Sequence, residues 1–467
     1  MLFNSYEFLF LFLPLVLLGY YALVPRRARL LLLTLASYFF YGWWDYRFCS
    51  LMLISTLIDY AAGKGIGGSA DPRIRRRWMI ASIVSNLSLL GFFKYYDLAA
   101  RTVNQALSFF GAPDPLLPLL HIILPVGISF YTFQSMSYSI DIYLGAARPA
   151  RSFVDFACFV ALYPQLIAGP IVRYRDLAEQ LIERSHTVAK FALGITFFVL
   201  GLAKKVILAD GVAPLVGPAF EAAAPGLFTA WTGLLAYTMQ IYFDFSGYSD
   251  MAVGLGLMLG FRMPQNFDSP YKAVSITDFW RRWHITLSSW LRDYLYIPLG
   301  GNRLGPVRTY FNLFLTMLLG GLWHGANWTF VLWGAYHGIL LAIERAAGKK
   351  GLLAWAPAAA QQLVTFGLAM FGWVLFRAAT PGQVRTMFRG LFGANGAEAH
   401  VRAAMAANPL PYLMLAVTLL LAFGFRNTWE IQWRNGWTLA LFLAALFAAS
   451  VAAILVNTSS PFLYFQF

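Results

Sequence analysis

Long apolar segments recur along the whole of this 467-residue chain and constrain its fold more than any other feature. An α-helix needs about 20 mostly apolar residues to cross the hydrocarbon core of a bilayer. Apolar runs of this kind lie near 7–25, 28–46, 48–66, 78–99, 153–172, 189–209, 228–248, 309–322, 327–346, 362–378, 411–425 and 438–456. Shorter or broken apolar pieces lie at 116–145, 251–262 and 276–298. These runs predict an all-α, polytopic membrane protein with about 11–13 transmembrane or re-entrant helices.

The composition excludes the soluble alternatives. Charged residues make up 12% of the chain, about half of the roughly 25% found in soluble domains. Too few polar side chains therefore exist to cover water-facing surfaces. The 17% aromatic content excludes disorder, and two cysteines exclude a disulfide scaffold or a thiolate metal cage. No soluble module interrupts the apolar runs, so we expect one integral membrane domain over 1–467.

The net charge of +14 indicates membrane topology rather than nucleic-acid binding, because the cations lie in short clusters between apolar runs. Arg26, Arg27 and Arg29 separate the first two runs. A second cluster lies between the third and fourth runs and comprises Lys64, Arg73, Arg75, Arg76 and Arg77. Since basic loops face the cytoplasm, we expect the N-terminus outside. No small-residue cleavage site closes the first run, so we expect its helix to be retained.

Ionisable residues gather in the second half of the chain, within segments that otherwise belong at membrane depth. The stretch 240–250 reads QIYFDFSGYSD and contains Asp244 and Asp250. The stretches 278–293 and 319–328 read DFWRRWHITLSSWLRD and LGGLWHGANW. Such residues are costly unless they face a cavity or a partner, and loops at this depth must be buried or line a water-filled space. The pattern predicts a polar chamber built from about 240–338.

The stretch 278–293 places its aromatic residues at helical spacing. On one continuous helix, a single face runs from Trp280 through Trp283 and His284 to Leu291 and Tyr294. This phasing predicts that His284 points with the tryptophans toward the protein interior. The alternative is an amphipathic helix that lies in the membrane interface, with tryptophan and arginine at the headgroups.

His324 is the stronger candidate for chemistry. It is flanked by Gly320, Gly321 and Gly325, so a backbone or a ligand can approach it closely. Histidine titrates near physiological pH and suits general-base work on a hydroxyl; the alternative is a hydrogen-bonded packing role. The remaining histidines are weaker candidates for catalysis. His337 is expected to have a packing role, and three others are expected in loops: His121, His186 and His400.

Other motifs do not support a different chemistry. The sequence has no GxSxG elbow and no HExxH, and we expect no metal site because His324 and His337 lack carboxylates at ligand spacing. The glycines of 254–260 miss the dinucleotide-binding spacing by one residue, so helix packing is the better interpretation. A proton or ion pathway through the carboxylates stays open at this point.

Several long runs of sequence resemble the membrane-bound O-acyltransferase family, and within it the bacterial branch that includes the alginate O-acetyltransferase. The runs with the greatest similarity are 240–261, 264–303 and 314–338. Further matching runs are MLFNSYEFLFLFLPL at 1–15, ILPVGISFYTFQSMSYSIDIY at 123–143, LIAGPIVRYRDL at 166–177, GWVLFRA at 372–378 and the closing PFLYFQF. The resemblance therefore extends from end to end.

The resemblance implies a ring of tilted helices around a central tunnel, in the inner membrane of a bacterium. It implies that His324, in the WHG motif, is catalytic and that His284, in RRWHITL, is a second catalytic histidine on the opposite wall. It further implies a cytoplasmic acyl thioester as donor, expected to be acetyl-CoA, with no tightly bound cofactor. The acceptor would be an extracytoplasmic polysaccharide such as alginate, reached directly or through periplasmic acetyl-relay or acetyltransferase proteins.

Residues and resemblance together suggest a mechanism in which His324 is the general base. A donor to the oxyanion is also needed; the options are His284, an indole N–H of Trp283 or Trp323, and a glycine amide near 320–325. A serine-borne or histidine-borne acyl intermediate is not required but stays open. Further substrate or tunnel candidates are Asp244, Tyr248, Asn327, Arg281 and Arg282. Arginines that could attract a coenzyme or lipid phosphate are Arg281, Arg282, Arg292 and Arg303.

Three rival functions remain. D-alanyl or other acyl transfer to a cell-wall polymer is the rival within the family. A proton-coupled transporter or channel would use the same ionisable residues, although the chain shows no two-fold internal repeat of the kind that transporters commonly have. A non-catalytic scaffold would have no reason to contain both His284 and His324.

Overall fold

The computed structural model describes the whole chain except residues 112–114, 349–352, 397–404, 435, 457–461 and 464–467. The described residues form helices joined by turns and loops, without a β-strand among them. The all-α prediction is therefore confirmed. The chain divides into two compact units, one made of Met1–Ile195 with Ala252–Pro264 and the other of Thr196–Met251 with Gln265–Phe467.

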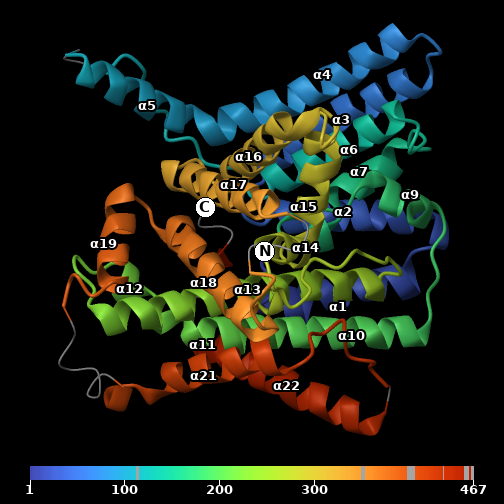
Figure 1. Ribbon diagram of the computed structural model, residues 1–467. Helices are drawn as coiled ribbons and strands as arrows, with labels where there is room; N and C mark the ends of the chain where they lie inside the picture. Colours follow the sequence, from blue (N-terminus) through green and yellow to red (C-terminus); the bar gives the residue numbers. More distant parts are fainter. Residues whose placement is uncertain (112–114, 349–352, 397–404, 435, 457–461, 464–467) are drawn as a thin grey trace. The chain divides into compact units, whose positions relative to one another are not determined.

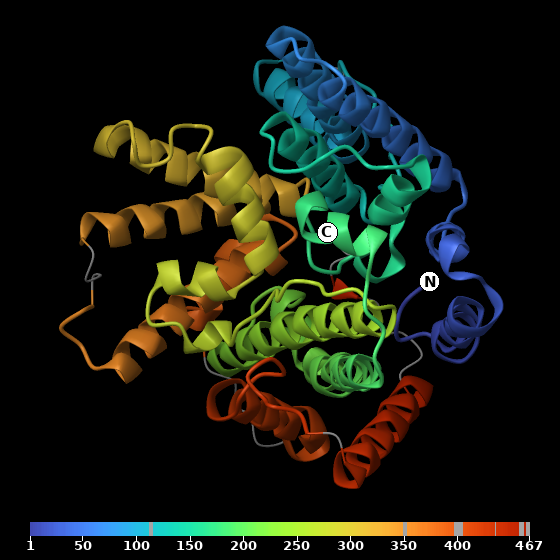
Figure 2. The ribbon, with the colours of Figure 1, turned by 90° about the vertical axis from the view of Figure 1, so that its right-hand side faces the viewer.

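The first unit begins with a helical run over Glu7–Leu23, whose middle is α1 (Leu13–Leu18). Its other helices are α2 (Arg29–Gly42), α3 (Arg47–Gly67), α4 (Pro72–Leu90), α5 (Tyr96–Phe109), α6 (Ile128–Tyr143), α7 (Phe153–Ala161), α8 (Tyr163–Leu166) and α9 (Tyr174–Ile182). The helices α3, α4 and α6 pack against one another (Figures 1 and 2), and α6 is buried along almost its whole length.

A buried carboxylate on α3 shows how this unit accommodates charge. Asp59 is fully buried and accepts hydrogen bonds from Ser82 Oγ at 2.6 Å and from Asn86 Nδ2 at 2.9 Å. Both donors lie on α4. Polar side chains on facing helices therefore satisfy the carboxylate inside the unit, as a group buried at membrane depth requires.

The second unit contains the segments in which the sequence concentrates its ionisable residues. Its helices are α11 (Asp210–Val212), α12 (Gly217–Phe220), α14 (Ile276–Arg282), α15 (Ile285–Leu291), α16 (Gly305–His324), α17 (Trp328–Ala346), α18 (Ala358–Arg377), α19 (Pro381–Leu391), α21 (Pro409–Gly424) and α22 (Trp437–Val456). Two helices, α10 (Val188–Ala203) and α13 (Leu227–Met258), have residues in both units.

Three helical stretches in the described part of the chain are long and apolar enough to cross a membrane: Val188–Phe220, Ala358–Arg377 and Trp437–Val456. Two shorter apolar stretches are Glu7–Leu23 and Pro409–Gly424. The predicted span at 153–172 does not form one helix, because the chain breaks at Leu162 between α7 and α8. Pro164 explains the break, since it has no N–H to donate and its ring clashes with the preceding turn.

Glycines allow α16 and α17 to pack at very short range, and the two helices lie side by side in Figure 1. A Cβ on Gly321 would lie 2.2 Å from the carbonyl oxygen of Phe330, and one on Gly334 would lie 2.5 Å from that of Met317. Gly321, one of the glycines near His324, therefore admits the backbone of α17 rather than a ligand. Gly201 of α10 and Gly247 of α13 meet in the same way.

We expect Gly321→Ala to lower the free energy of unfolding by about 1–3 kcal/mol, as overpacking does in tightly packed cores. The added methyl group would collide with backbone, which cannot move aside as a side chain does. Gly367→Ala on α18 is the matched control, since nothing lies within 4 Å of its Cβ position. Thermal unfolding of both purified variants in the same detergent tests this. Equal melting temperatures for Gly321→Ala and wild type would contradict it.

Candidate functional site

The stretch 276–298 forms two short helices rather than one, with a sharp turn between α14 and α15. The turn lies at His284, which adopts a left-handed backbone conformation with φ of +43°. The single helical face predicted from Trp280 to Tyr294 is therefore wrong. The expected burial of His284 is confirmed, because its side chain is fully buried. Local sequence spacing gave no sign of a left-handed residue, which costs about 1–3 kcal/mol and needs support from its surroundings.

Asn266 supplies that support from a neighbouring loop. Its main-chain oxygen accepts the Ile285 N–H at 2.9 Å. Its side-chain Oδ1 accepts the hydroxyl of Thr286 at 2.9 Å and the N–H of Thr286 at 3.3 Å. The same Oδ1 lies 3.0 Å from Nδ1 of His284. One asparagine thus holds three consecutive residues of the turn.

These bonds also determine the tautomer of His284. A backbone N–H can only donate, so the atom of Asn266 that accepts from Thr286 is an oxygen and not the amide nitrogen. That oxygen cannot donate to the imidazole. Nδ1 of a neutral His284 must therefore carry the proton, and Nε2 keeps its lone pair. Nε2 is buried and has no hydrogen-bond partner among the described residues.

His324 ends α16 and is 4% exposed. Its ring centroid lies 6.3 Å from that of His284, so the structure brings the two histidines of the sequence prediction together within one unit. Trp323 lies beside both, at 5.0 Å from His324 and 6.0 Å from His284. The rings of Trp333 and Phe376 lie edge-on to His324 at 5.1 and 5.2 Å.

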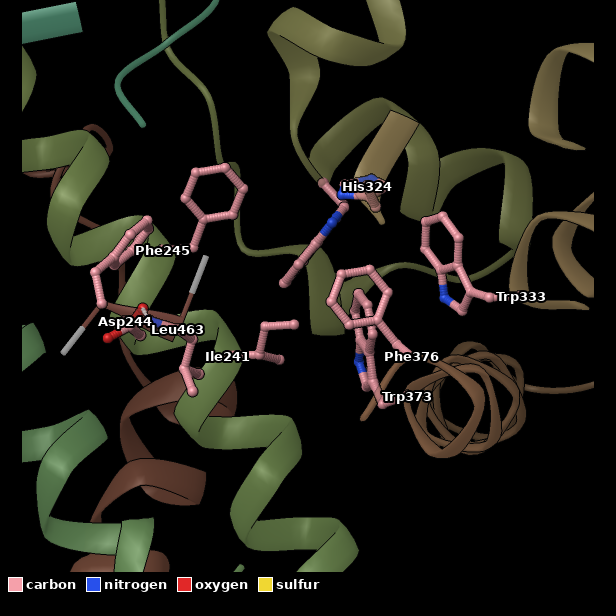
Figure 3. A pocket seen from close by; sticks show the side chains of 10 residues that line it. Ile241, Asp244, Phe245, His324, Trp333, Trp373, Phe376 and Leu463 are labelled. Atoms are coloured by element: carbon pink, nitrogen blue, oxygen red, sulfur yellow. Dashed lines mark hydrogen bonds between the residues drawn. The ribbon is translucent and has the colours of Figure 1, made fainter. Parts of the chain in front are cut away.

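His324 opens onto a narrow cavity of about 10 Å³ (Figure 3). The other lining residues are Ile241, Asp244, Phe245, Trp283, Trp333, Trp373, Phe376, Phe462 and Leu463. The predicted polar chamber is thus a mainly aromatic cavity in which His324 and Asp244 are the ionisable groups. The space is narrow enough that an acyl group would need side chains to move. This fits a site that excludes water from its reaction.

Sequence reasoning missed five aromatic residues that line the cavity: Phe245, Trp333, Trp373, Phe376 and Phe462. The indole N–H of Trp333 is buried and has no hydrogen-bond partner among the described residues. A signal was present, because all five lie within the runs that resemble the family, Trp333 in 314–338 for example and Trp373 in 372–378. Asn266 was also missed, although it lies within the matching run 264–303.

Asp244 lies in the cavity wall and is held by a buried cation. Nζ of Lys205 lies 2.8 Å from Asp244 Oδ1 and 2.7 Å from Asp210 Oδ1. The other oxygen of Asp244 accepts the Leu463 N–H at 3.1 Å. Part of the chain's C-terminal segment is therefore fixed in the cavity, where the ring of Phe462 packs on that of Tyr248 at 4.5 Å.

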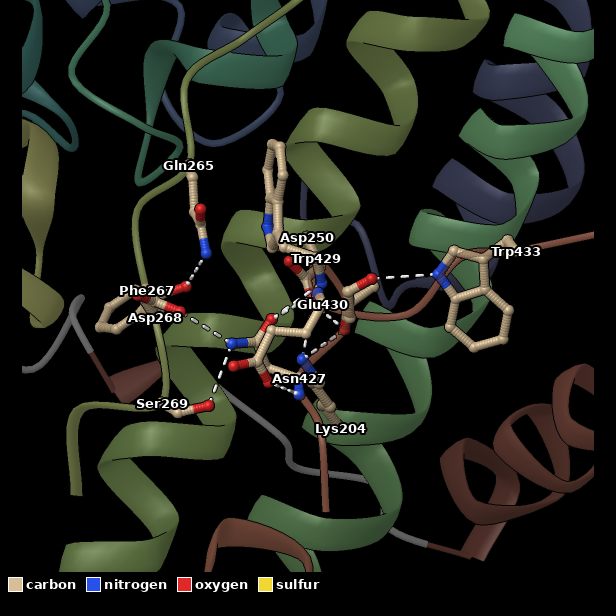
Figure 4. Close-up of polar contacts among 11 residues, drawn as sticks. Lys204, Asp250, Gln265, Phe267, Asp268, Ser269, Asn427, Trp429, Glu430 and Trp433 are labelled. Atoms are coloured by element: carbon tan, nitrogen blue, oxygen red, sulfur yellow. Dashed lines mark hydrogen bonds and ion pairs between the residues drawn. The ribbon is translucent and has the colours of Figure 1, made fainter. Parts of the chain in front are cut away.

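Asp250, the second carboxylate of the 240–250 stretch, is paired away from this cavity (Figure 4). Its Oδ2 lies 2.6 Å from Nζ of Lys204 and accepts the hydroxyl of Thr428 at 2.8 Å. Asn427 next to it donates to Asp268 at 3.1 Å and to the hydroxyl of Ser269 at 3.0 Å. These contacts tie the loop after α21 to the rest of the second unit.

The remaining site candidates lie outside the cavity lining. Asn327 caps α17 through Thr329 N–H and donates to the Ala379 carbonyl at 2.7 Å. Arg282 is paired with Asp278 at 2.9 Å. Arg292 is likewise paired with its neighbour Asp293, whereas Arg281 and Arg303 are exposed. These contacts indicate structural or surface positions.

The other histidines follow their expected environments where the structure describes them. His337 is fully buried among aromatic rings, with Nδ1 3.4 Å from the indole nitrogen of Trp280. His121 is exposed in the loop before α6, and His186 lies in the loop between α9 and α10. His400 lies outside the described residues.

The sequence relationships agree with this geometry. The model of the membrane-bound O-acyltransferase family matches residues 146–350. A probable alginate O-acetylase of Pseudomonas putida is 45% identical, and the match covers 100% of both chains. The chain belongs to the membrane-bound O-acyltransferase family. It is therefore an O-acyltransferase of the membrane, and both histidines lie within the matched region.

Two other relatives bear on the kind of acyl transfer. A peptidoglycan O-acetyltransferase of Helicobacter pylori is 36% identical over 100% of this chain and 98% of its own. A teichoic acid D-alanyltransferase of Bacillus subtilis is 27% identical over 57% of this chain and 72% of its own. The similarity to the two acetylating relatives is thus higher and extends over the full length.

We expect Lys205→Met to destabilise the protein by about 3–5 kcal/mol, because it leaves the buried carboxylate of Asp244 and the partly buried one of Asp210 without their cation. Lys205→Arg keeps a positive charge and should retain more of the stability. The melting temperatures of the two purified variants provide the comparison. If Lys205→Met melts with the wild type, the ion pairs do not support this part of the structure.

Proposed function

We propose that this enzyme transfers an acetyl group from a cytoplasmic thioester, acetyl-CoA, to hydroxyls of an extracytoplasmic polysaccharide, directly or through a periplasmic relay protein. The observation that carries the proposal is that His284 lies next to His324, which opens onto a narrow aromatic cavity, in a family member whose full-length relatives are named as acetylases of alginate and peptidoglycan. We place it in the bacterial inner membrane with its N-terminus in the periplasm, from the basic loops.

The chemistry needs a base and an oxyanion donor. His324 removes the proton of the acceptor hydroxyl, and the oxygen attacks the thioester carbonyl to form a tetrahedral oxyanion. The carbon–sulfur bond then breaks, and the leaving thiolate takes the proton from His324. A positioned base of this kind contributes about 10²–10⁴-fold. A donor aimed at the oxyanion contributes further because the surrounding site is dry.

The tautomer of His284 indicates that this residue accepts a hydrogen bond and is not the oxyanion donor. With its proton on Nδ1, a neutral His284 presents a lone pair at Nε2 and accepts a hydrogen bond there. We assign it to the acceptor hydroxyl, which it orients toward His324. Trp333 lines the cavity, and its indole N–H has no acceptor among the residues that the structure describes, so it is the donor we assign to the oxyanion.

The rivals from the sequence are less well supported. D-alanyl transfer has only the weaker, partial similarity to the Bacillus subtilis relative in its favour. A transporter would need a hydrated path lined by free ionisable groups. Asp250 and Asp244 are instead paired with Lys204 and Lys205. Acetyl transfer therefore accounts for more of the observations.

The first test replaces His324. A strain that lacks the native gene should regain base-labile acetate on its envelope and secreted polysaccharide with the wild-type gene and fail to do so with His324→Ala. His121→Ala is the matched control, because this exposed histidine lies outside the cavity. Immunoblots of membranes must show equal protein levels. Acetate restored by His324→Ala would remove this residue from the chemistry, and acetate unaffected by gene deletion would contradict acetylation itself.

The second test addresses His284 through Asn266. Asn266→Asp keeps an acceptor oxygen for Thr286 but adds a negative charge beside Nδ1, which favours the imidazolium. Because the imidazolium has no lone pair at Nε2, we expect the acidic limb of the pH–activity profile to move to higher pH. Thr286→Val, which removes one hydroxyl and no charge, should leave the profile in place. An unmoved profile in active Asn266→Asp would contradict the assigned role of His284.

A further inference from the structure

Basic residues from two separate segments of the first unit meet around one buried tyrosine. Tyr20 is fully buried, and its hydroxyl lies 2.9 Å from both Arg184 Nε and His186 Nε2. The guanidinium of Arg29 lies over the Tyr20 ring at 4.8 Å. Arg184 also lies over the ring of Phe261 at 4.6 Å, directly before Arg262. We call Arg29, Arg184, His186, Lys190 and Arg262 the basic cluster.

The basic cluster has no carboxylate partner in the part of the chain that the structure describes. The side chains of Arg184 and Lys190 donate instead to the main-chain oxygens of Gln180 and Ser185, both at 3.3 Å. Nε of Arg29 is buried and has no hydrogen-bond partner among the described residues. Glu179 lies on the nearby helix α9 and Glu183 directly follows it, yet neither forms an ion pair with the cluster in the described structure.

The electrostatic setting of His186 reflects the same crowding of charge. This residue is exposed in the loop before α10, and partial desolvation together with the positive charges of Arg184, Arg29 and Lys190 lowers its pKa. The cluster thus forms a region of positive potential. Cations held this close repel one another unless an anion lies between them.

Membrane topology alone does not account for this arrangement. The positive-inside rule explains why basic residues occupy loops on one side of a bilayer. It does not explain why the side chains of Arg29, Arg184 and His186 converge on Tyr20, or why a buried guanidinium N–H has no partner among the described residues. Guanidinium groups match the geometry of phosphate oxygens and bind them through charge-assisted hydrogen bonds.

We propose that the basic cluster is a binding site for a phosphate group. The phosphate belongs either to a phosphorylated coenzyme or to the headgroup of an anionic phospholipid, and the chemistry of recognition is the same for both. Arg29 and Arg184 supply the guanidinium donors, and Lys190 and Arg262 add positive charge at the edge. The coenzyme alternative rests on the proposed acetyl-CoA donor, whereas the lipid alternative does not depend on acetyl transfer.

The experiment measures binding rather than turnover, with the purified full-length protein in nanodiscs of neutral phosphatidylcholine. The probes are coenzyme A, measured by thermophoresis, and added phosphatidylglycerol, measured by its retention in native mass spectrometry. We expect Arg184→Gln to weaken binding of one probe about tenfold, the loss expected for one charge-assisted hydrogen bond. Arg262→Gln, which is more exposed, serves as a second variant if Arg184→Gln does not fold.

Arg385→Gln is the matched control, since it removes one exposed positive charge from the second unit. Weaker binding of coenzyme A in the cluster variants alone would identify a coenzyme phosphate. Loss of phosphatidylglycerol in those variants alone would identify a lipid headgroup. The proposal is overturned if wild-type protein binds neither probe, or if Arg385→Gln weakens binding as much as the cluster variants do.

Discussion

Inside a bilayer, each backbone amide and each charged side chain must find its partner within the protein, and the other features of this structure follow from that constraint. It requires helices throughout, and it requires a partner for each buried carboxylate. Asp59 is satisfied by hydroxyl and amide groups on the neighbouring helix. Asp244 and Asp250 are satisfied by lysines. Because the lysines neutralise these carboxylates, most of the cavity beside His324 is lined by aromatic side chains.

The same constraint bears on the two histidines. His284 sits in a strained, left-handed turn that a buried site tolerates only when other groups hold it. Asn266 holds it with both its main-chain and side-chain oxygens. The bond that supports the turn also leaves the lone pair of His284 on Nε2. The side-chain oxygen of Asn266 therefore both supports the backbone of the turn and determines which nitrogen of His284 carries the proton.

Much of the fold could be predicted, because helices at membrane depth are recognised by runs of apolar residues that need no knowledge of their neighbours. The prediction failed where a single residue overrides a run. Pro164 divides the predicted span at 153–172 into two helices. At His284 the helix is interrupted by contacts with a residue distant in sequence, Asn266. The helical phasing of 278–293 therefore predicted the burial of this histidine correctly but its backbone conformation wrongly.

The sequence by itself determined the membrane character, the all-helical class, the family and the two histidines, since composition and motif spacing are local properties of the chain. Only the tertiary structure decided which groups surround them. The position of Trp333 and Trp373 on the cavity, the pairing of Asp244 with Lys205 and the tautomer of His284 all depend on contacts between residues far apart in sequence. Such contacts depend on how helices pack, which hydrophobic runs alone do not specify.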